Sequence, residues 1–293
     1  MIPSNPIFVI VSKLDRLAQS DNFESIHNYF ELGWEMAATR IDCLYLIVTG
    51  KIKPETHTVV TLNGREFLYR TLMPVARWED WAAERGIKDA SRLPSEGILD
   101  LTNFYASTAS MDWSIFHHGP EKRYKHEVWV RPLYDHFEAP DVSGLAAAPF
   151  FLCCWRYRNS HHRERNTPKA TAQAIHDLLL KKGSPVYVVG FGAEDLCDGR
   201  KVVHVPLPTF CALAKHPNCR AVVGAMTGTM QFAAIICRSK IVVYQHNRQE
   251  PVNTQNHPVV LGECVNFHRN KRLIQYEPVV PLPIFLQRLD KFI

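Results

Sequence analysis

The chain has 293 residues, of which 46% are hydrophobic and 22% charged, and its formal net charge is +5. These ordinary globular values exclude a disordered or fibrous protein, and the length favours two compact domains over one large one. The longest apolar stretch, residues 145–155, is interrupted by Pro149 and is shorter than the roughly 20 residues that span a bilayer, so no membrane span is predicted. The small positive surplus favours anionic partners such as nucleotides, nucleic acid or phosphorylated lipid.

The N-terminal half opens on an apolar strand and continues irregularly. Strands are predicted at residues 7–11, 43–49, 59–62, 98–101 and 128–130. A helix is predicted to begin near Asp21, with Glu24 as the second residue of a capping box, and to reach Ala37 at helical spacing. No basic leader precedes the first apolar run, so we predict a strand there rather than a signal peptide, and a cytoplasmic protein. Residues 1–140 are thus predicted to form an N-terminal Rossmann-like lobe.

In the C-terminal half, short apolar runs alternate with helical segments, the order that builds a parallel sheet. Strands are predicted at residues 150–154, 186–190, 202–205, 221–224 and 241–245. Helices are predicted from Thr167 to Gly183 and at residues 208–215, 230–237 and 282–292. Residues 141–280 are predicted to be a doubly wound α/β lobe. Residues 138–148 are a candidate hinge, and residues 281–293 are predicted to pack back on the N-terminal lobe.

The strongest ligand signal follows the predicted strand 221–224. There Thr227, Gly228 and Thr229 open an apolar helix. The first backbone N–H groups of a helix and its dipole attract phosphate, and ligands of open α/β sheets bind at the carboxyl ends of strands. An ordinary helix cap with a glycine for close packing is the alternative interpretation.

This stretch resembles the helix-opening motif of heptosyltransferase-like enzymes, in which a strand ends in a small residue and Ser-Asp-Thr-Gly leads into an apolar helix with His-Leu-Ala-Ala. The matching residues are Thr227, Gly228, Ala233 and Ala234. Met226 stands where the family has Asp, and Gln231 where it has His. The resemblance implies an α/β protein of two facing Rossmann-like lobes, the GT-B type, with parallel sheets and helices on both faces. In that architecture residues 141–280 would be the nucleotide-sugar-binding lobe and residues 1–140 the acceptor-binding lobe. It also implies that the amides of Gly228 and Thr229 hold the donor diphosphate, with Gln231 close by.

Three further groups follow other strands of the predicted C-terminal sheet. Arg156 and Arg158 lie nearest strand 150–154 in a basic loop and are candidates to neutralise a leaving diphosphate, although a solvated loop is the alternative. In the donor interpretation, Gly190 and Gly192 let the backbone approach the nucleotide; the third glycine of a dinucleotide motif is missing. The remaining candidates, which would line the base, are His204 and Pro206.

Transfer to a hydroxyl with inversion also requires a general base. Asp15 follows the first strand, where the resemblance places the catalytic Asp of the family, and Asp100, near the end of strand 98–101, is the rival. The sequence has no Asp-x-Asp motif and no CxxC pair, so no metal is predicted, and its eight cysteines are predicted to be free thiols. No cofactor is predicted beyond the nucleoside diphosphate sugar, which is the donor substrate.

The sequence therefore predicts a metal-independent, inverting glycosyltransferase of hexosyl or heptosyl type. The acceptor would be a glycan or a hydroxymethylated base in DNA. The basic and aromatic run 123–126 is compatible with a DNA acceptor. A strongly salt-sensitive affinity for duplex DNA would favour that acceptor. Two alternatives are a non-catalytic nucleic-acid-binding protein that uses the basic loop, and a nucleotide-sugar epimerase or hydrolase.

Overall fold

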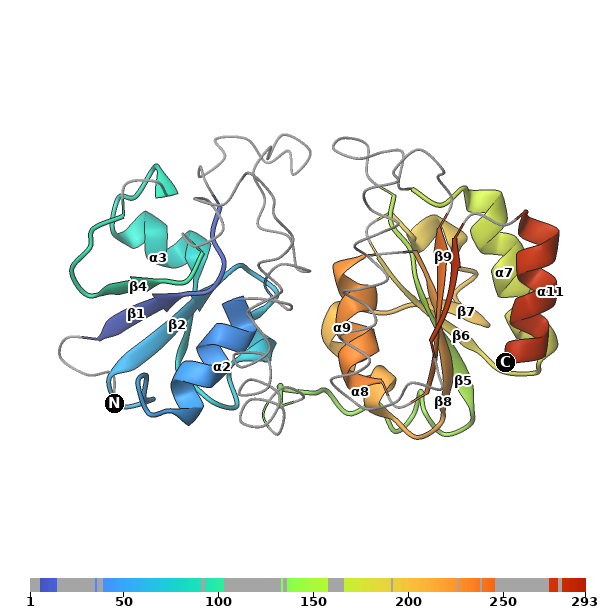
Figure 1. Ribbon diagram of the computed structural model, residues 1–293, viewed down its shortest axis with the longest axis horizontal. Coiled ribbons are helices and arrows are strands. Elements are labelled where there is room, and N and C mark those ends of the chain that lie inside the picture. The colour runs from blue at the N-terminus through green and yellow to red at the C-terminus, as the bar shows by residue number, and fades with distance from the viewer. Residues whose placement is uncertain are drawn as a thin grey trace. The chain divides into compact units, whose positions relative to one another are not determined.

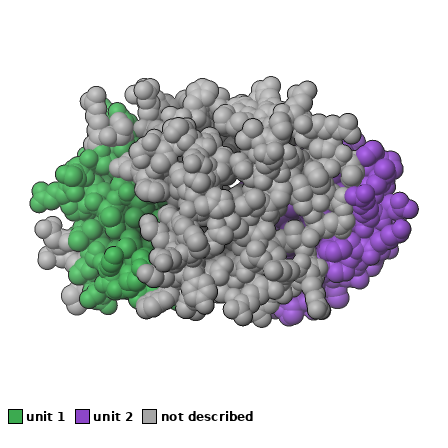
Figure 2. All heavy atoms as spheres, in the orientation of Figure 1, with its two compact units in different colours: residues 1–138 green, residues 139–293 purple. Residues whose placement is uncertain are grey.

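The chain divides into two compact units, residues 1–138 and 139–293 (Figures 1 and 2). The computed structural model describes residues 6–14, 35, 39–90, 93–102, 133, 136–157, 166–190, 192–225, 227–237, 239–245, 274–278 and 281–293. The division falls between Glu138 and Ala139, two residues before the boundary expected from the sequence.

Unit 1 is built on a parallel sheet with the strand order β3-β2-β1-β4. Its strands are β1 (Ile7–Ile10), β2 (His57–Thr61), β3 (Val75–Arg77) and β4 (Ile98–Asp100). Its described helices are α2 (Arg40–Val48), the 3₁₀ helix η3 (Glu66–Leu68) and α3 (Trp78–Glu84). Helix α3 covers one face of the sheet, because Trp78 and Trp81 pack with Ile10 and Val60 in one buried cluster.

The apolar run 43–49, predicted as a strand, lies in helix α2, so that prediction is wrong. A run this short fits a buried strand and a short helix equally well, because it contains too few turns to show a period. The helix begins at Arg40, whose buried guanidinium donates from Nη2 to the carbonyl oxygens of Leu68 (3.3 Å) and His136 (2.8 Å). These contacts join segments distant in sequence, which local patterns do not reveal.

Two elements of unit 1 were missed by the prediction, and two predicted elements fall largely or wholly outside the described residues. Strand β3 and helix α3 were not predicted. The helix predicted to begin near Asp21 lies outside the described residues apart from Glu35, and the strand predicted at residues 128–130 lies wholly outside them. Strands β1, β2 and β4 lie where apolar runs predicted them.

Unit 2 contains a six-stranded parallel sheet with the order β10-β9-β8-β5-β6-β7. Its strands are β5 (Phe150–Cys154), β6 (Val186–Val189), β7 (Val202–His204), β8 (Cys219–Gly224), β9 (Lys240–Gln245) and β10 (Ile274–Pro278). Its described helices are α7 (Lys169–Lys181), the 3₁₀ helix η7 (Glu194–Leu196), α8 (Leu207–Lys215), α9 (Gly228–Ile236) and α11 (Leu282–Phe292). Figure 1 shows α7 and α11 on one side of this sheet, and α8 and α9 on the other.

The last helix belongs to unit 2. Phe285 and Leu289 of α11 are buried in the same core cluster as Leu179 of α7, and the Nζ of Lys182 lies 2.8 Å from an Oδ1 of Asp290. The apolar face of α11 is thus covered by α7 and the sheet of unit 2, and packing of residues 281–293 on the N-terminal lobe stays a prediction. The predicted class, α/β with parallel sheets flanked by helices, is confirmed.

Candidate functional site

Each sheet has a point where the strand order reverses. In unit 2 the chain runs from β5 outward through β6 and β7, then returns to add β8, β9 and β10 on the other side of β5. In unit 1 the corresponding reversal lies between β1 and β4. Because loops diverge at such a point, the carboxyl ends of the two flanking strands are where open parallel sheets bind ligands.

Helix α9 begins at the unit 2 reversal. Its cap, Thr227, is extended (φ −136°, ψ 164°), and its Oγ1 accepts a hydrogen bond of 3.1 Å from the backbone N–H of Met230. The backbone N–H groups of Gly228 and Thr229 lie in the same first turn, and the first N–H groups of a helix have no carbonyl partner within the helix. Within the described part of the chain, no hydrogen bond reaches either of them. Two donors and a positive dipole end are thus available for an anion.

Strand β8 delivers this helix close to β5. A Cβ placed on Gly224 would lie 2.2 Å from the carbonyl oxygen of Cys154, so only glycine allows the two strand ends to approach this closely. One residue later, the N–H of Ala225 donates to that same carbonyl at 2.9 Å. The start of α9 is therefore tied to the residue with which β5 ends.

Arg156 leaves the sheet at the same edge. Its side chain is buried, with 8% exposed. Trp155 and Tyr157 on either side both pack on the core beneath α7 and α11. Side chains alternate along an extended chain, so Arg156 starts from the opposite face, the side of the sheet that α8 and α9 cover. The predicted cation and the predicted helix terminus thus come from adjacent strands at one edge.

The two glycines after β6 pack against this extension of β5. Gly190 has φ +138°, and a Cβ there would lie 1.7 Å from the carbonyl oxygen of Trp155. Gly192 has φ +70°, and a Cβ there would lie 3.0 Å from both the Cβ and the carbonyl oxygen of Tyr157. Packing of one chain segment on another therefore accounts for both glycines, and their approach to a nucleotide stays a prediction.

His204 and Pro206 follow the next strand. The Nε2 of His204 lies 3.4 Å from the carbonyl oxygen of Gly190 and 3.5 Å from an Oε1 of Glu194. Pro206 caps α8 in an extended conformation. The structure thus brings His204 to the same loop edge as Gly190, while contact with a base stays a prediction.

Sequence reasoning missed a buried pair in this unit. The indole Nε1 of Trp155 donates to the Nε2 of His176 at 2.8 Å. Burial lowers the pKa of His176 from 6.5 to about 4, against the opposing charge of Asp177, so the ring is neutral near pH 7. A signal existed, since His176 follows Ala172 and precedes Leu179 at helical spacing on the apolar face of α7.

Asp100 lies at the unit 1 reversal, where it is already engaged. Its Oδ2 accepts a hydrogen bond of 2.6 Å from the Nζ of Lys13, and its Oδ1 accepts from the N–H (2.9 Å) and the hydroxyl (2.6 Å) of Thr102. Both charged side chains are over nine-tenths buried. Asp100 therefore joins β1 to β4.

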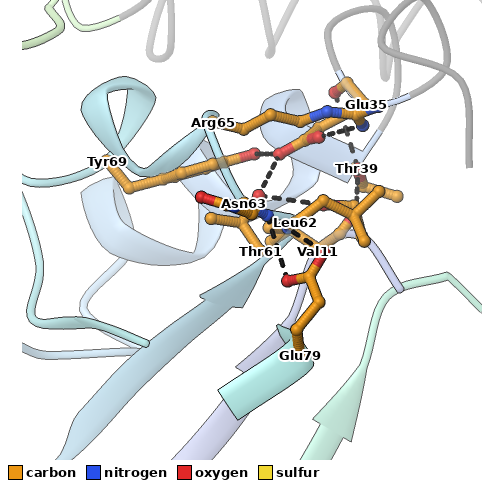
Figure 3. Close-up of polar contacts among 10 residues, drawn as sticks. Val11, Glu35, Thr39, Thr61, Leu62, Asn63, Arg65, Tyr69 and Glu79 are labelled. Carbon is orange, nitrogen blue, oxygen red and sulfur yellow. Dashed lines mark hydrogen bonds and ion pairs between the residues drawn. The ribbon is translucent and has the colours of Figure 1, made fainter. Parts of the chain in front are cut away.

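A second buried carboxylate, Glu35, lies at the ends of β1 and β2 (Figure 3). Arg65 donates to its Oε2 at 2.7 Å, while Tyr69 and Thr61 each donate to its Oε1 at 2.8 Å. Since the Thr61 proton is used this way, the Ser12 hydroxyl must donate to Thr61, at 2.9 Å. The Ser12 oxygen in turn accepts a hydrogen bond of 3.0 Å from the backbone N–H of Leu62. The charge of Glu35 thus orients a chain of hydroxyl groups that reaches the end of β1.

Several predicted residues cannot be placed. Asp15 and Arg158 lie outside the described residues, as does Met226, and the side chain of Gln231 does too. Among the residues that the structure describes, no group of His, Cys, Asp or Glu side chains is arranged to hold a metal ion. None of the described helices combines the length and hydrophobicity needed to cross a bilayer.

Comparison with known proteins identifies the fold. No protein-family model and no curated protein matches the sequence. The solved structure of ADP-heptose LPS heptosyltransferase II from E. coli matches over 98% of both chains, with a TM-score of 0.52 and 12% sequence identity. The E. coli heptosyltransferase WaaC, solved with ADP, matches over 97% of this chain and 96% of that one, with a TM-score of 0.44 and 12% identity. The likeness to heptosyltransferase II confirms the predicted heptosyltransferase-like fold.

Proposed function

We propose that the protein transfers a sugar from a nucleoside diphosphate sugar to a hydroxyl acceptor. One observation carries the proposal. The amides at the start of α9, which no described residue hydrogen-bonds, and the buried Arg156 follow adjacent strands at the reversal point of unit 2. The heptosyltransferase-like fold supports the same reaction class. Because both carboxylate oxygens of Asp100 already accept hydrogen bonds within unit 1, we propose Asp15, and not Asp100, as the general base.

The chemistry explains why both positive elements are required. The acceptor oxygen bonds to the anomeric carbon, the bond from that carbon to the phosphate oxygen breaks, and the acceptor proton passes to the carboxylate of Asp15. The departing diphosphate carries the charge that develops. The N–H groups of Gly228 and Thr229 and the guanidinium of Arg156 would stabilise it where water is excluded.

Nucleoside diphosphate binding is the first test, and ADP is the first ligand because the structural neighbour is named for ADP-heptose. Isothermal titration with ADP, UDP and GDP should show one preferred base, and the corresponding monophosphate should bind more weakly. Arg156→Ala should weaken diphosphate binding by about tenfold or more, since charge-assisted hydrogen bonds are worth roughly 1.5–3 kcal/mol. Failure of all three diphosphates to bind would overturn the proposal.

A matched pair of variants isolates the helix amide. Gly228→Pro removes one N–H, and proline is well tolerated at the first helical position. The extended conformation of Thr227 also suits a residue that precedes proline. Gly228→Ala is the control because it keeps the N–H. We expect Gly228→Pro to bind diphosphate several-fold more weakly than Gly228→Ala at similar thermal stability; equal affinities would remove the amide from the site.

Product analysis separates transfer from the other uses of a nucleotide sugar. With donor alone, a transferase releases free sugar slowly, whereas an epimerase converts the donor without releasing a nucleoside diphosphate. Adding lipopolysaccharide-type glycans or hydroxymethylated duplex DNA should accelerate diphosphate release only for the true acceptor class. Asp15→Asn should leave donor binding intact and abolish that acceleration.

A further inference from the structure

Trp155 and His176 form a buried hydrogen bond beside the residue proposed to bind diphosphate. The two rings lie 5.9 Å apart between centroids, and both side chains are essentially inaccessible to solvent. Because Nε2 of the neutral imidazole accepts the indole N–H, the ring proton resides on Nδ1. Within the described part of the chain, Nδ1 has no hydrogen-bond partner.

This arrangement is costly for the fold. The three residues nearest His176 on the buried face of α7 are apolar, namely Ala172, Ile175 and Leu179, and Thr171 lies further toward the start of the helix. A buried N–H without a partner loses its hydration without replacement, so a leucine of similar size would pack there at lower cost. Residues that break a local packing rule in an otherwise regular element mark places where function sets the choice.

We propose that His176 is a positioning residue for Arg156, acting through the indole of Trp155; this rests on the proposed function. The backbone N–H of Trp155 donates to the backbone carbonyl of Val189 at 3.0 Å, and this is the last hydrogen bond between the two chain segments that form β5 and β6. Beyond that point the chain leaves the sheet, and the hydrogen bond that the indole donates to His176 of α7 fixes the rotation of the indole. The direction in which Arg156 departs is thereby set.

The opposite side of the same segment is held by backbone packing. Gly190 lies against the carbonyl of Trp155, and Gly192 lies against Tyr157. The Nζ of Lys169, at the start of α7, lies 5.8 Å from the centroid of the Tyr157 ring. Residues 155–157 are therefore clamped between the loop after β6 and helix α7, and the indole hydrogen bond is the one directional polar contact that joins the Trp155 side chain to α7.

Three variants test the proposal with ADP as the probe. His176→Leu removes the acceptor and should weaken ADP binding about tenfold, the range of one hydrogen bond. His176→Gln offers a carbonyl oxygen to the indole and should recover affinity to within about threefold. Leu179→Ala, one turn along the same face of α7, is the matched control for stability: it should lower the melting temperature and leave the ADP affinity, measured well below that temperature, unchanged.

Spectroscopy checks the intermediate step without ligand. The indole N–H resonance of Trp155 should move upfield in His176→Leu and stay near its wild-type position in Leu179→Ala. Backbone amides of residues 155–157 should exchange faster with solvent in His176→Leu than in Leu179→Ala.

The outcomes separate the two proposals. If wild-type protein fails to bind ADP, UDP and GDP, the proposed function fails, and the positioning role is judged by the exchange of amides 155–157 alone. Exchange that is equal in His176→Leu and Leu179→Ala overturns it. If ADP binds and His176→Leu binds it as tightly as wild type, or if Leu179→Ala weakens binding equally, His176 is merely structural.

Discussion

Lys13 and Asp100 form a buried ion pair, 2.6 Å long, that joins the ends of β1 and β4. The hydroxyl and N–H of Thr102 occupy the other carboxylate oxygen. Both carboxylate oxygens of Asp100 thus already accept hydrogen bonds from donors of unit 1. Asp100 therefore fits a role in fixing the edge of the unit 1 sheet better than a role as general base.

Lys13→Met should destabilise unit 1 by about 3–5 kcal/mol, because it leaves the Asp100 carboxylate buried without its cation. Lys13→Met combined with Asp100→Leu should recover part of that loss, since neither charge then remains. Urea unfolding of the wild type, the single variants and the double variant measures the coupling. Strictly additive losses would show that the two side chains are not energetically paired.

Tyr69→Phe should destabilise unit 1 by roughly 1.5–3 kcal/mol, the value of a hydrogen bond to a charged group. Tyr187→Phe in unit 2 is the matched control. Its hydroxyl donates to the neutral carbonyl of Leu145 at 2.7 Å, and the expected loss there is about 0.5–1.5 kcal/mol. Chemical unfolding of each variant checks the order. A smaller loss for Tyr69→Phe than for Tyr187→Phe would argue that Glu35 is uncharged.

Unit 2 was the more predictable half for a physical reason. Strands of a parallel sheet covered on both faces read as continuous apolar runs, and β5, β6 and residues 221–224 of β8 do so. Breaks are equally legible: Gly183, with φ +76°, follows α7 as the sequence predicted. In unit 1 the run that became α2 was too short to show a period, and its start depends on contacts of Arg40 with residues far along the chain.

The site was predictable only to the level of strand ends. A strand order and a rule for where ligands bind place Arg156 and Gly228 at one edge without knowledge of any contact. Pairing is different. Asp100 read as a free carboxylate because its cation lies 87 residues earlier, and His176 meets an indole 21 residues before it. Patterns along a chain carry no information on such contacts, since they arise when elements pack.

The stability of unit 2 should depend on His176 between about pH 4 and pH 6.5. Burial lowers the pKa of His176 to about 4 in the folded protein, whereas the unfolded chain has the ordinary value near 6.5. In that window the unfolded state binds more protons, so stability falls as the pH falls. The loss attributable to His176 approaches about 3 kcal/mol at pH 4, from roughly 1.4 kcal/mol for each pKa unit.

His176→Gln removes this titration and serves as the comparison. The difference in unfolding free energy between wild type and His176→Gln should favour wild type most near pH 7 and shrink toward pH 4. Carboxylates titrate in both proteins and cancel in that difference. A difference that stays constant with pH would mean that His176 is protonated in the folded state or accessible to water.

Gly190→Ala should be among the most damaging single substitutions in unit 2. Its φ of +138° is a conformation that side chains rarely adopt, and the new Cβ would lie 1.7 Å from the carbonyl oxygen of Trp155. Backbone atoms on both sides must then separate, which breaks the hydrogen bond between the backbone N–H of Trp155 and the carbonyl of Val189.

Gly199→Ala is the control, because its φ is +70° and nothing lies within 4 Å of the added Cβ. The control should lose only the strain of a left-handed residue, about 1–2 kcal/mol. Gly190→Ala should lose at least twice that and also ADP binding, measurable by thermal unfolding and titration. Equal losses of stability would mean that the chain after β6 can move away from β5 without harm. The packing of that loop on residues 155–157 would then not fix the position of Arg156.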